Sequence, residues 1–335
     1  MPADRQSIGD YVLLGSLPWG RTVEHAHARK AGSLFALRLL RAEHGKDPVA
    51  VEAFVARGRA ALRFRHPGLV RATQVGRQDG RYFIATEYVA GQTLAALLDR
   101  CRRTGQRLSL GHVAAIAHAI ASALEQIHPH VRPCHPHPGD VLIGYDGVVR
   151  LLVSEVPSGV PAFIAPEQVR GQEASEVADQ FLLGAMMFEM LTLESAFSAE
   201  NEFQSLEKVR RAEVPPPSLW NDRVPNEMDE IVRRAAAREP AKRFPNAGAM
   251  AQALGDLQKG FMFGTVDLAD LLRRTFPEEV QAEEAARLAA GQSSEDAHAI
   301  KDRMMRAPRA IGLEPIYWVG IAVMLAGGAW LAAGY

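Results

Sequence analysis

Side chains that commonly bind transition metals gather in one short stretch of the chain. They are His128, His130, Cys134, His135, His137 and Asp140. On an extended strand, the rings of His135 and His137 would lie on one side, but this spacing fixes no further pair of ligands. The stretch matches no zinc-binding module. Two interpretations therefore stay open: a metal site at His135, His137 and Asp140, or a polar loop without metal.

Charged residues elsewhere suggest two other kinds of ion site. Arg38 and Arg57 could together hold an anion, such as a phosphate group on a partner, or could each be solvated alone. Asp140 and Glu155 could hold a divalent cation, although such a site would be weak without phosphates that bridge to the metal.

The elements that must position these residues change in type along the chain. Short stretches bounded by turn residues predict strands between residues 10 and 90, interrupted by one helix. The strands are Tyr11–Gly15, Leu34–Leu40, Ala72–Gly76 and Tyr82–Tyr88, and the helix is Pro48–Arg65. Beyond residue 92, apolar residues recur at helical spacing, with one hairpin around Tyr145-Asp146-Gly147. The helices are Leu94–Thr104, Leu110–His128, Glu176–Thr192, Glu227–Ala237 and Ala247–Leu257, and the hairpin is Val141–Val153.

Composition narrows the class of protein. The chain has 335 residues, of which 47% are hydrophobic and 23% charged, so it can form a large folded core. Its 38 basic and 39 acidic side chains give a net charge of -1, which argues against a general nucleic-acid binder. Its two cysteines, Cys101 and Cys134, are expected to be free thiols in a reducing compartment.

An apolar segment without a charged residue runs from Pro315 to Tyr335. About 20 apolar residues span a hydrocarbon core of ~30 Å, so the segment predicts a single transmembrane helix. The basic residues Lys301, Arg303, Arg306 and Arg309 precede it. With no signal peptide expected at the N-terminus, the positive-inside rule predicts a tail-anchored protein of the cell membrane whose N-terminal part is cytoplasmic.

Small residues recur on one face of this predicted membrane helix. They are Ala322, Ala326, Ala329 and Ala333. Such stripes allow close packing of two helices, so a homodimer through this segment is one interpretation. Small residues are common in membrane helices in any case, which is the other.

Several short motifs, taken in order, carry a family resemblance. They are Arg65-His66-Pro67 with Leu69-Val70, Glu87-Tyr88-Val89 with Gly91, the segment 161–168 (PAFIAPEQ), Asp179 with Gly184, and Arg238 to Phe244 (REPAKRF). At this spacing they resemble the bacterial-type serine/threonine protein kinases over residues 8 to 257, whereas any one motif alone would be weak. The resemblance implies a two-lobed, protein-kinase-like α+β fold, with a C-terminal single transmembrane helix added to it. The small lobe would be residues 1–90, the large lobe 91–257, a helical extension and linker 258–314, and the membrane helix 315–335.

The phosphate-binding loop of such kinases is degraded here. Of the three glycines of a GxGxxG loop only Gly20 remains, while Pro18 lacks an N–H and Val23 blocks close approach of phosphate. The family's adenine-covering valine aligns with His25. A residual adenine slot would consist of Gly20, His25, Ala36, Glu87, Val89 and Leu142. No cofactor is expected, although ATP without metal stays open for this slot.

The positions that would perform phosphoryl transfer are replaced. By the resemblance, Arg38 stands at the lysine, Arg57 at its partner glutamate, His135 at the catalytic base, His137 at the phosphate-binding lysine, Asp140 at the metal-binding asparagine and Val153 at the metal-binding aspartate. Two cations ~4 Å apart would repel by about 4 kcal/mol at an effective dielectric constant near 20, so Arg38 and Arg57 are expected to point apart or to share an anion. Only nine residues separate Glu155 from Ala165, which is short for an activation segment.

By contrast, residues with a structural role in the family are kept. They are Glu167, Asp179 and Arg243. Keeping the scaffold while losing the base, lysine, glutamate and aspartate predicts a membrane-anchored pseudokinase that scaffolds or regulates signalling partners, which could include an active kinase. Two alternatives stay open: an active serine/threonine kinase with atypical catalytic residues, and a metal-responsive interaction module built on the His/Cys loop.

Overall fold

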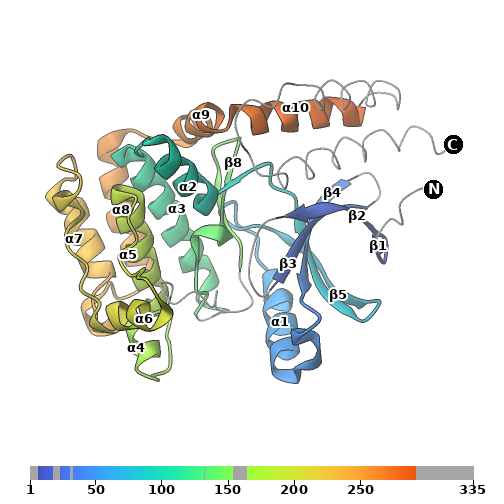
Figure 1. Ribbon diagram of the computed structural model, residues 1–335, viewed down its shortest axis with the longest axis horizontal. Helices are drawn as coiled ribbons and strands as arrows, with labels where there is room; N and C mark the ends of the chain where they lie inside the picture. The colour runs from blue at the N-terminus through green and yellow to red at the C-terminus, as the bar shows by residue number, and fades with distance from the viewer. Residues whose placement is uncertain (1–6, 18–22, 31–32, 132, 154–163, 292–335) are drawn as a thin grey trace. The chain divides into compact units, whose positions relative to one another are not determined.

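The computed structural model describes residues 7–17, 23–30, 33–131, 133–153 and 164–291, drawn as ribbons in Figure 1. Gly20 and the predicted membrane segment Pro315–Tyr335 lie outside these residues. Among the described helices, none is both long and apolar enough to cross a bilayer. The described chain forms two compact units, the first from 7–51, 72–90 and 276–291, and the second from 52–71 and 91–275.

The first unit contains a six-stranded antiparallel sheet in the order β1-β2-β3-β4-β6-β5. Its strands are β1 (Ser7–Ile8), β2 (Tyr11–Leu17), β3 (Val23–Lys30), β4 (Ser33–Leu40), β5 (Ala72–Gln78) and β6 (Arg81–Glu87). Asp79 and Gly80 join β5 to β6 with φ of 51° and 78°, the backbone that a two-residue hairpin turn requires. Tyr11 packs edge-on against Phe35 and Phe83, at ring distances of 5.4 and 5.8 Å. The strand-rich character predicted for this part of the chain is confirmed.

The second unit is mainly helical. Its helices are α2 (Leu94–Thr104), α3 (Leu110–Ile127), α4 (Pro166–Val169), α5 (Val177–Thr192), α6 (Glu202–Arg211), α7 (Asn226–Ala235), α8 (Ala247–Phe261) and α9 (Thr265–Thr275), with α1 (Pro48–Ala61) joining it from Glu52 onward. Short 3₁₀ turns are η1 (His44–Lys46, in the first unit), η2 (Pro138–Asp140), η4 (Pro217–Leu219) and η5 (Pro240–Lys242). Thr93, Ser109, Asn201 and Asn246 cap α2, α3, α6 and α8 by accepting hydrogen bonds from backbone N–H groups of the first turn. The predicted helix bounds agree with the structure to within a few residues.

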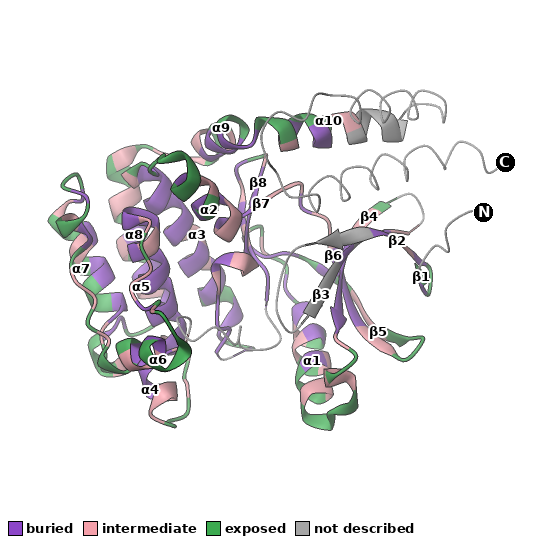
Figure 2. Ribbon diagram, in the orientation of Figure 1, coloured by how far each residue is buried: buried purple, intermediate pink, exposed green. Residues whose placement is uncertain are grey.

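Helix α5 forms the centre of the second unit. Almost every residue from Ala178 to Thr192 is buried, as the purple ribbon in Figure 2 shows, and α3, α7 and α8 pack against it. A helix that is apolar on all sides is stable only when it is covered on all sides. Helix α5 therefore provides a fixed base for the polar residues that it carries.

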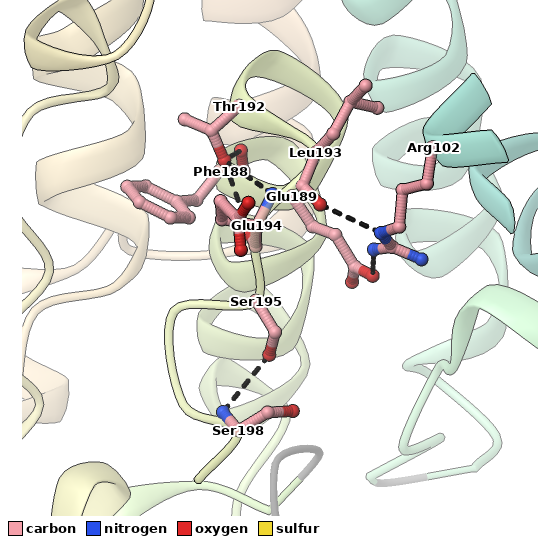
Figure 3. A network of polar contacts seen from close by, with 8 residues as sticks. All are labelled: Arg102, Phe188, Glu189, Thr192, Leu193, Glu194, Ser195 and Ser198. Atoms are coloured by element: carbon pink, nitrogen blue, oxygen red, sulfur yellow. Dashed lines mark hydrogen bonds and ion pairs between the residues drawn. The ribbon is translucent and has the colours of Figure 1, made fainter. Parts of the chain in front are cut away.

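Polar contacts fix the C-terminal end of α5 (Figure 3). Arg102 of α2 donates from Nε to the carbonyl oxygen of Leu193 over 2.8 Å and forms an ion pair with Glu189. Leu193 has φ of 66°, and the Thr192 hydroxyl accepts a hydrogen bond from the N–H of Glu194 at 3.1 Å. The bond from Arg102 satisfies the Leu193 carbonyl group, which a helix end otherwise leaves without a partner.

A small second sheet lies in the same unit and confirms the predicted hairpin. It consists of β7 (Gly91–Thr93), β8 (Val141–Gly144) and β9 (Val149–Leu151), in that order. Gly147 in the turn has φ of 76°, and a Cβ atom there would lie 1.7 Å from the carbonyl oxygen of Thr265. Only glycine fits this approach of the hairpin to the start of α9.

A proline divides the helical extension into two helices. Helix α9 ends at Thr275 and α10 (Pro277–Gly291) begins at Pro277, because proline is tolerated in the first turn of a helix but not in its interior. Helix α9 clusters with the second unit and α10 with the first. Within the first unit, the Tyr88 hydroxyl donates to the Glu283 carboxylate of α10 over 2.9 Å.

Candidate functional site

The loop at 133–140 is anchored by one carboxylate. Asp179, near the start of α5, is 0% exposed. Its Oδ2 accepts hydrogen bonds from Cys134 N at 2.7 Å and from His128 Nε2 at 2.9 Å, and its Oδ1 accepts one from His135 N at 2.8 Å. His135 has φ of 53°, which is unusual for a residue other than glycine, and these bonds hold it there. The structural role expected for Asp179 thus has a direct geometric basis.

A single amide determines the tautomer of His135. Gln168 accepts a hydrogen bond from Ala165 N through Oε1 at 3.1 Å, which leaves its Nε2 facing His135 Nε2 at 2.9 Å. An amide nitrogen can only donate, so His135 Nε2 must accept and the ring proton must lie on Nδ1. The basic nitrogen at the position of the catalytic carboxylate is therefore occupied by a neighbouring N–H group.

Burial keeps the His135 ring neutral. His135 is 6% exposed, and its pKa is lowered chiefly by that burial; the negative Asp179 opposes this shift and the positive Arg57 adds to it. Burial likewise raises the pKa of the Cys134 thiol well above its ordinary value. Both cysteines are free thiols and both are buried, and a protonated thiol in such a position is unreactive.

Acidification should destabilise the second unit through two buried histidines, His112 and His135, and the half-buried His118. Burial is the main cause that lowers the pKa of His112, His118 and His135 below 6.5 in the folded state. Below that pH the unfolded chain binds more protons than the folded chain, so the free energy of unfolding must fall as pH falls. We expect the unfolding temperature of the full chain to decrease from pH 7 to 5.5. Most carboxylates titrate below this window, which separates their effect from that of histidine.

Replacing His112 and His118 by glutamine should flatten this dependence on pH. Thermal unfolding of the two proteins, followed in parallel across the same pH series, provides the comparison. A wild-type unfolding temperature that stays constant or rises on acidification would contradict the lowered histidine pKa values.

His137 and Asp140 shape the turn that follows His135. His137 Nδ1 accepts from Gly139 N at 2.9 Å, and the carbonyl oxygen of Asp140 accepts from Leu152 N at 2.8 Å. Nowhere in the described ranges do three or more His, Cys, Asp or Glu side chains come together as a possible metal site. The predicted metal set of His135, His137 and Asp140 is thus not assembled, because the His135 ring faces Gln168 while the His137 ring caps its own turn.

The other degenerate positions are distributed over the two units. Arg38 lies in β4 of the first unit and is 3% exposed, whereas Arg57 is half-buried on α1 within the second unit. Val153 is buried at the end of the described segment 133–153. Of the pair Arg38 and Arg57, only Arg57 is placed with the loop, where its charge acts on Cys134 and His135.

The residues of the predicted adenine slot are also divided. Ala36, Glu87 and Val89 belong to the first unit, and Leu142 in β8 belongs to the second. The carbonyl oxygen of Ala36 accepts a hydrogen bond from the Thr86 hydroxyl at 3.3 Å. For His25 the structure describes the backbone, which pairs with Arg38 across β3 and β4.

The retained ion pair of Glu167 and Arg243 is buried in the second unit. Arg243 donates from both terminal nitrogens to the Glu167 carboxylate, each over 2.7 Å, and both residues are 3% exposed. Arg243 also donates to the carbonyl oxygens of Ala237 at 2.9 Å and Val177 at 3.0 Å. These bonds engage four of the five N–H groups of the guanidinium, which compensates the burial of its charge.

The sequence did not indicate the contacts of three residues in this arrangement. His128 donates to the Asp179 carboxylate that anchors the loop, Gln168 contacts His135 in the loop itself, and Glu283 accepts from the Tyr88 hydroxyl. Gln168 follows Glu167 in a motif that was recognised, but nothing in the motif indicated its partner. Glu283 is a buried glutamate in an otherwise amphipathic helix, and a charged residue on the apolar face was the available signal.

The fold is that of a protein kinase. The kinase domain of PknI from Mycobacterium tuberculosis superposes with a TM-score of 0.64 over 76% of this chain and 99% of that domain, at 22% identity. No protein-family model matches the chain.

The chain's relatives are bacterial protein kinases. It is 27% identical to the tyrosine-protein kinase MasK of Myxococcus xanthus over 304 residues, and 28% identical to the serine/threonine-protein kinase PrkC of Bacillus subtilis over 223 residues. It is 27% identical to PknA of Mycobacterium tuberculosis over 252 residues. These alignments cover 82%, 63% and 69% of this chain but 47%, 34% and 57% of the relatives, so the chain spans about half the length of the proteins it resembles. The resemblance to bacterial-type kinases is thereby confirmed.

Proposed function

We propose that this chain is a pseudokinase, a kinase-like domain that binds partners and does not transfer phosphate. The observation that carries the proposal is the state of His135. In the kinases that the chain resembles, a carboxylate at this position accepts the proton of the substrate hydroxyl. Here the ring is neutral and buried, and its lone pair accepts a hydrogen bond from Gln168. Proton abstraction would require that bond to break first.

Other replacements reinforce this proposal. Arginine at positions 38 and 57 replaces the lysine and glutamate of the attractive pair that active kinases use, and Val153 has no side-chain carboxylate to hold a metal. Meanwhile the buried pair of Glu167 with Arg243 and the bonds of Asp179 keep the large-lobe architecture intact. Loss of chemistry with retention of scaffold supports a role in protein contacts, including contacts with an active kinase.

Anchoring to the membrane is part of the proposal. It is supported by the charge-free segment Pro315–Tyr335 and the basic residues from Lys301 to Arg309 before it. The kinase-like domain would then face the cytoplasm and present its surfaces to partners at the membrane. A homodimer through the alanine stripe of this segment fits the same arrangement.

An active kinase is the second candidate, because the relatives are named as kinases. One experiment separates the two. The full chain, purified in detergent from the membrane fraction, is incubated with radiolabelled ATP and Mg²⁺ or Mn²⁺, and its thermal unfolding is measured with the same nucleotide. The pseudokinase proposal expects no transfer above background and no metal-dependent shift. A ligand at 100 times its dissociation constant would otherwise add about 2.7 kcal/mol, a shift of several degrees.

The controls define what contradicts the proposal. Autophosphorylation that is lost in both His135→Ala and Asp140→Ala would establish the kinase instead. A shift with ATP alone, without transfer, would keep the pseudokinase and add nucleotide binding. If the full chain were recovered from the soluble fraction instead of the membrane fraction, that result would contradict the proposed membrane anchor.

A further inference from the structure

The His135 ring carries a buried donor for which the described residues offer no acceptor. The Gln168 amide fixes the proton on Nδ1, and that atom is buried without a hydrogen-bond partner in the part of the chain that the structure describes. A buried donor that lacks an acceptor destabilises the folded state. Folded proteins satisfy nearly all such groups with protein, water or ligand atoms. The Nδ1–H group therefore calls for an acceptor that comes from outside these residues.

The charges around His135 indicate which kind of acceptor fits. Asp179 is negative, but its two oxygens already accept three hydrogen bonds, from His128, Cys134 and the His135 backbone. Arg57 acts on His135 as a positive charge from α1, within the same unit. A neutral N–H donor near a guanidinium group is a combination that binds oxyanions, because each oxygen can accept a charge-assisted hydrogen bond.

We propose that His135 and Arg57 form a binding site for a small oxyanion of the phosphate or sulfate type. In an active kinase the carboxylate at this position would repel such an ion. Replacement by a neutral imidazole with its proton on Nδ1 removes that repulsion and supplies a donor. The inference goes beyond the proposed function, since it requires neither nucleotide, nor membrane, nor phosphoryl transfer.

The same geometry argues against a cation as the ligand. A metal ion binds imidazole through a lone pair, but Nδ1 carries the proton and the lone pair of Nε2 is engaged by Gln168. The positive charge of Arg57 further disfavours a cation. An uncharged acceptor could use the His135 donor but would gain little from Arg57, so the dependence of binding on Arg57 distinguishes an anion from a neutral ligand.

Thermal unfolding of the full chain in detergent tests the proposal with inorganic phosphate, sulfate and chloride at equal ionic strength. We expect phosphate and sulfate to raise the unfolding temperature by about 3 °C or more near saturation, while chloride does not. Arg57→Gln should weaken the response about tenfold in apparent affinity. Arg59→Gln, two residues along the same helix and exposed, is the matched control and should respond like the wild type.

A second readout observes the ring itself. Long-range ¹H–¹⁵N spectra of the histidines should show His135 as the neutral Nδ1–H tautomer, and its Nδ1 resonance should move on addition of phosphate. His135→Phe should abolish both the spectral change and the thermal shift. If that variant does not fold, the comparison of Arg57→Gln with its control Arg59→Gln still tests the proposed anion site. Equal shifts with chloride, or a phosphate response that survives Arg57→Gln unchanged, would overturn the proposal, whereas absence of kinase activity would not bear on it.

Discussion

Arg243→Ala should lower the free energy of unfolding by about 3–5 kcal/mol, because it leaves the Glu167 carboxylate buried and uncompensated. The substitution also removes the donors to the carbonyl oxygens of Ala237 and Val177. For a unit of about 200 residues this corresponds to a fall in unfolding temperature of about 10 °C. Differential scanning calorimetry of the full chain in detergent would measure it.

Arg233→Ala is the matched control for this large effect. Arg233 forms an ion pair with Glu230 on the exposed face of α7, and a solvated pair contributes at most about 1 kcal/mol. The control should therefore unfold within a few degrees of the wild type. A loss for Arg243→Ala no larger than that for Arg233→Ala would mean that the buried pair does not stabilise the second unit.

Asp179→Asn should release the loop at 133–140 from α5. The two carboxylate oxygens accept three hydrogen bonds, whereas an amide offers one oxygen and one nitrogen, so at least one N–H group would face another donor. A buried group left in this way costs about 1–3 kcal/mol. Asp179→Ala, which leaves all three donors without an acceptor, should cost about 3–5 kcal/mol.

Amide hydrogen exchange tests this prediction locally. The N–H groups of Cys134 and His135 should be strongly protected in the wild type and should exchange at least tenfold faster in Asp179→Asn, since a loss of about 1.4 kcal/mol is a tenfold change. Asp256→Asn, at an exposed ion pair with Lys259 on α8, should leave both amides unchanged. Unchanged protection in Asp179→Asn would show that the loop is held by other contacts.

Sequence patterns predicted the helices and the hairpin well, because helical spacing and turn residues depend on neighbouring residues in the chain. Apolar residues at helical spacing located α3 and α8, and Asp146-Gly147 located the turn between β8 and β9. Glu167 and Arg243 were expected to keep a structural role from the family resemblance, and they form two hydrogen bonds of 2.7 Å.

The contacts of the candidate site could not be predicted in the same way. The metal interpretation assumed that His135 and His137 lie on a regular extended strand with both rings on one side. His135 instead has positive φ, so its ring departs from that alternation and meets Gln168, 33 residues away. The bond from Tyr88 to Glu283 joins residues 195 apart. Periodicity identifies the face of an element but does not identify the residue that covers it.

The amide of Gln168 has a consequence for how the chain can vary. It must accept from the Ala165 N–H and donate to His135 with the same side chain. A glutamate could only accept and would draw the ring proton to Nε2, giving the opposite neutral tautomer; a lysine could only donate and would leave the Ala165 N–H without its partner. While histidine occupies position 135, position 168 is therefore expected to remain an amide, because glutamine both accepts from the Ala165 N–H and donates to the ring. The motif glutamine thus gains a second task in this chain, which is to select the histidine tautomer.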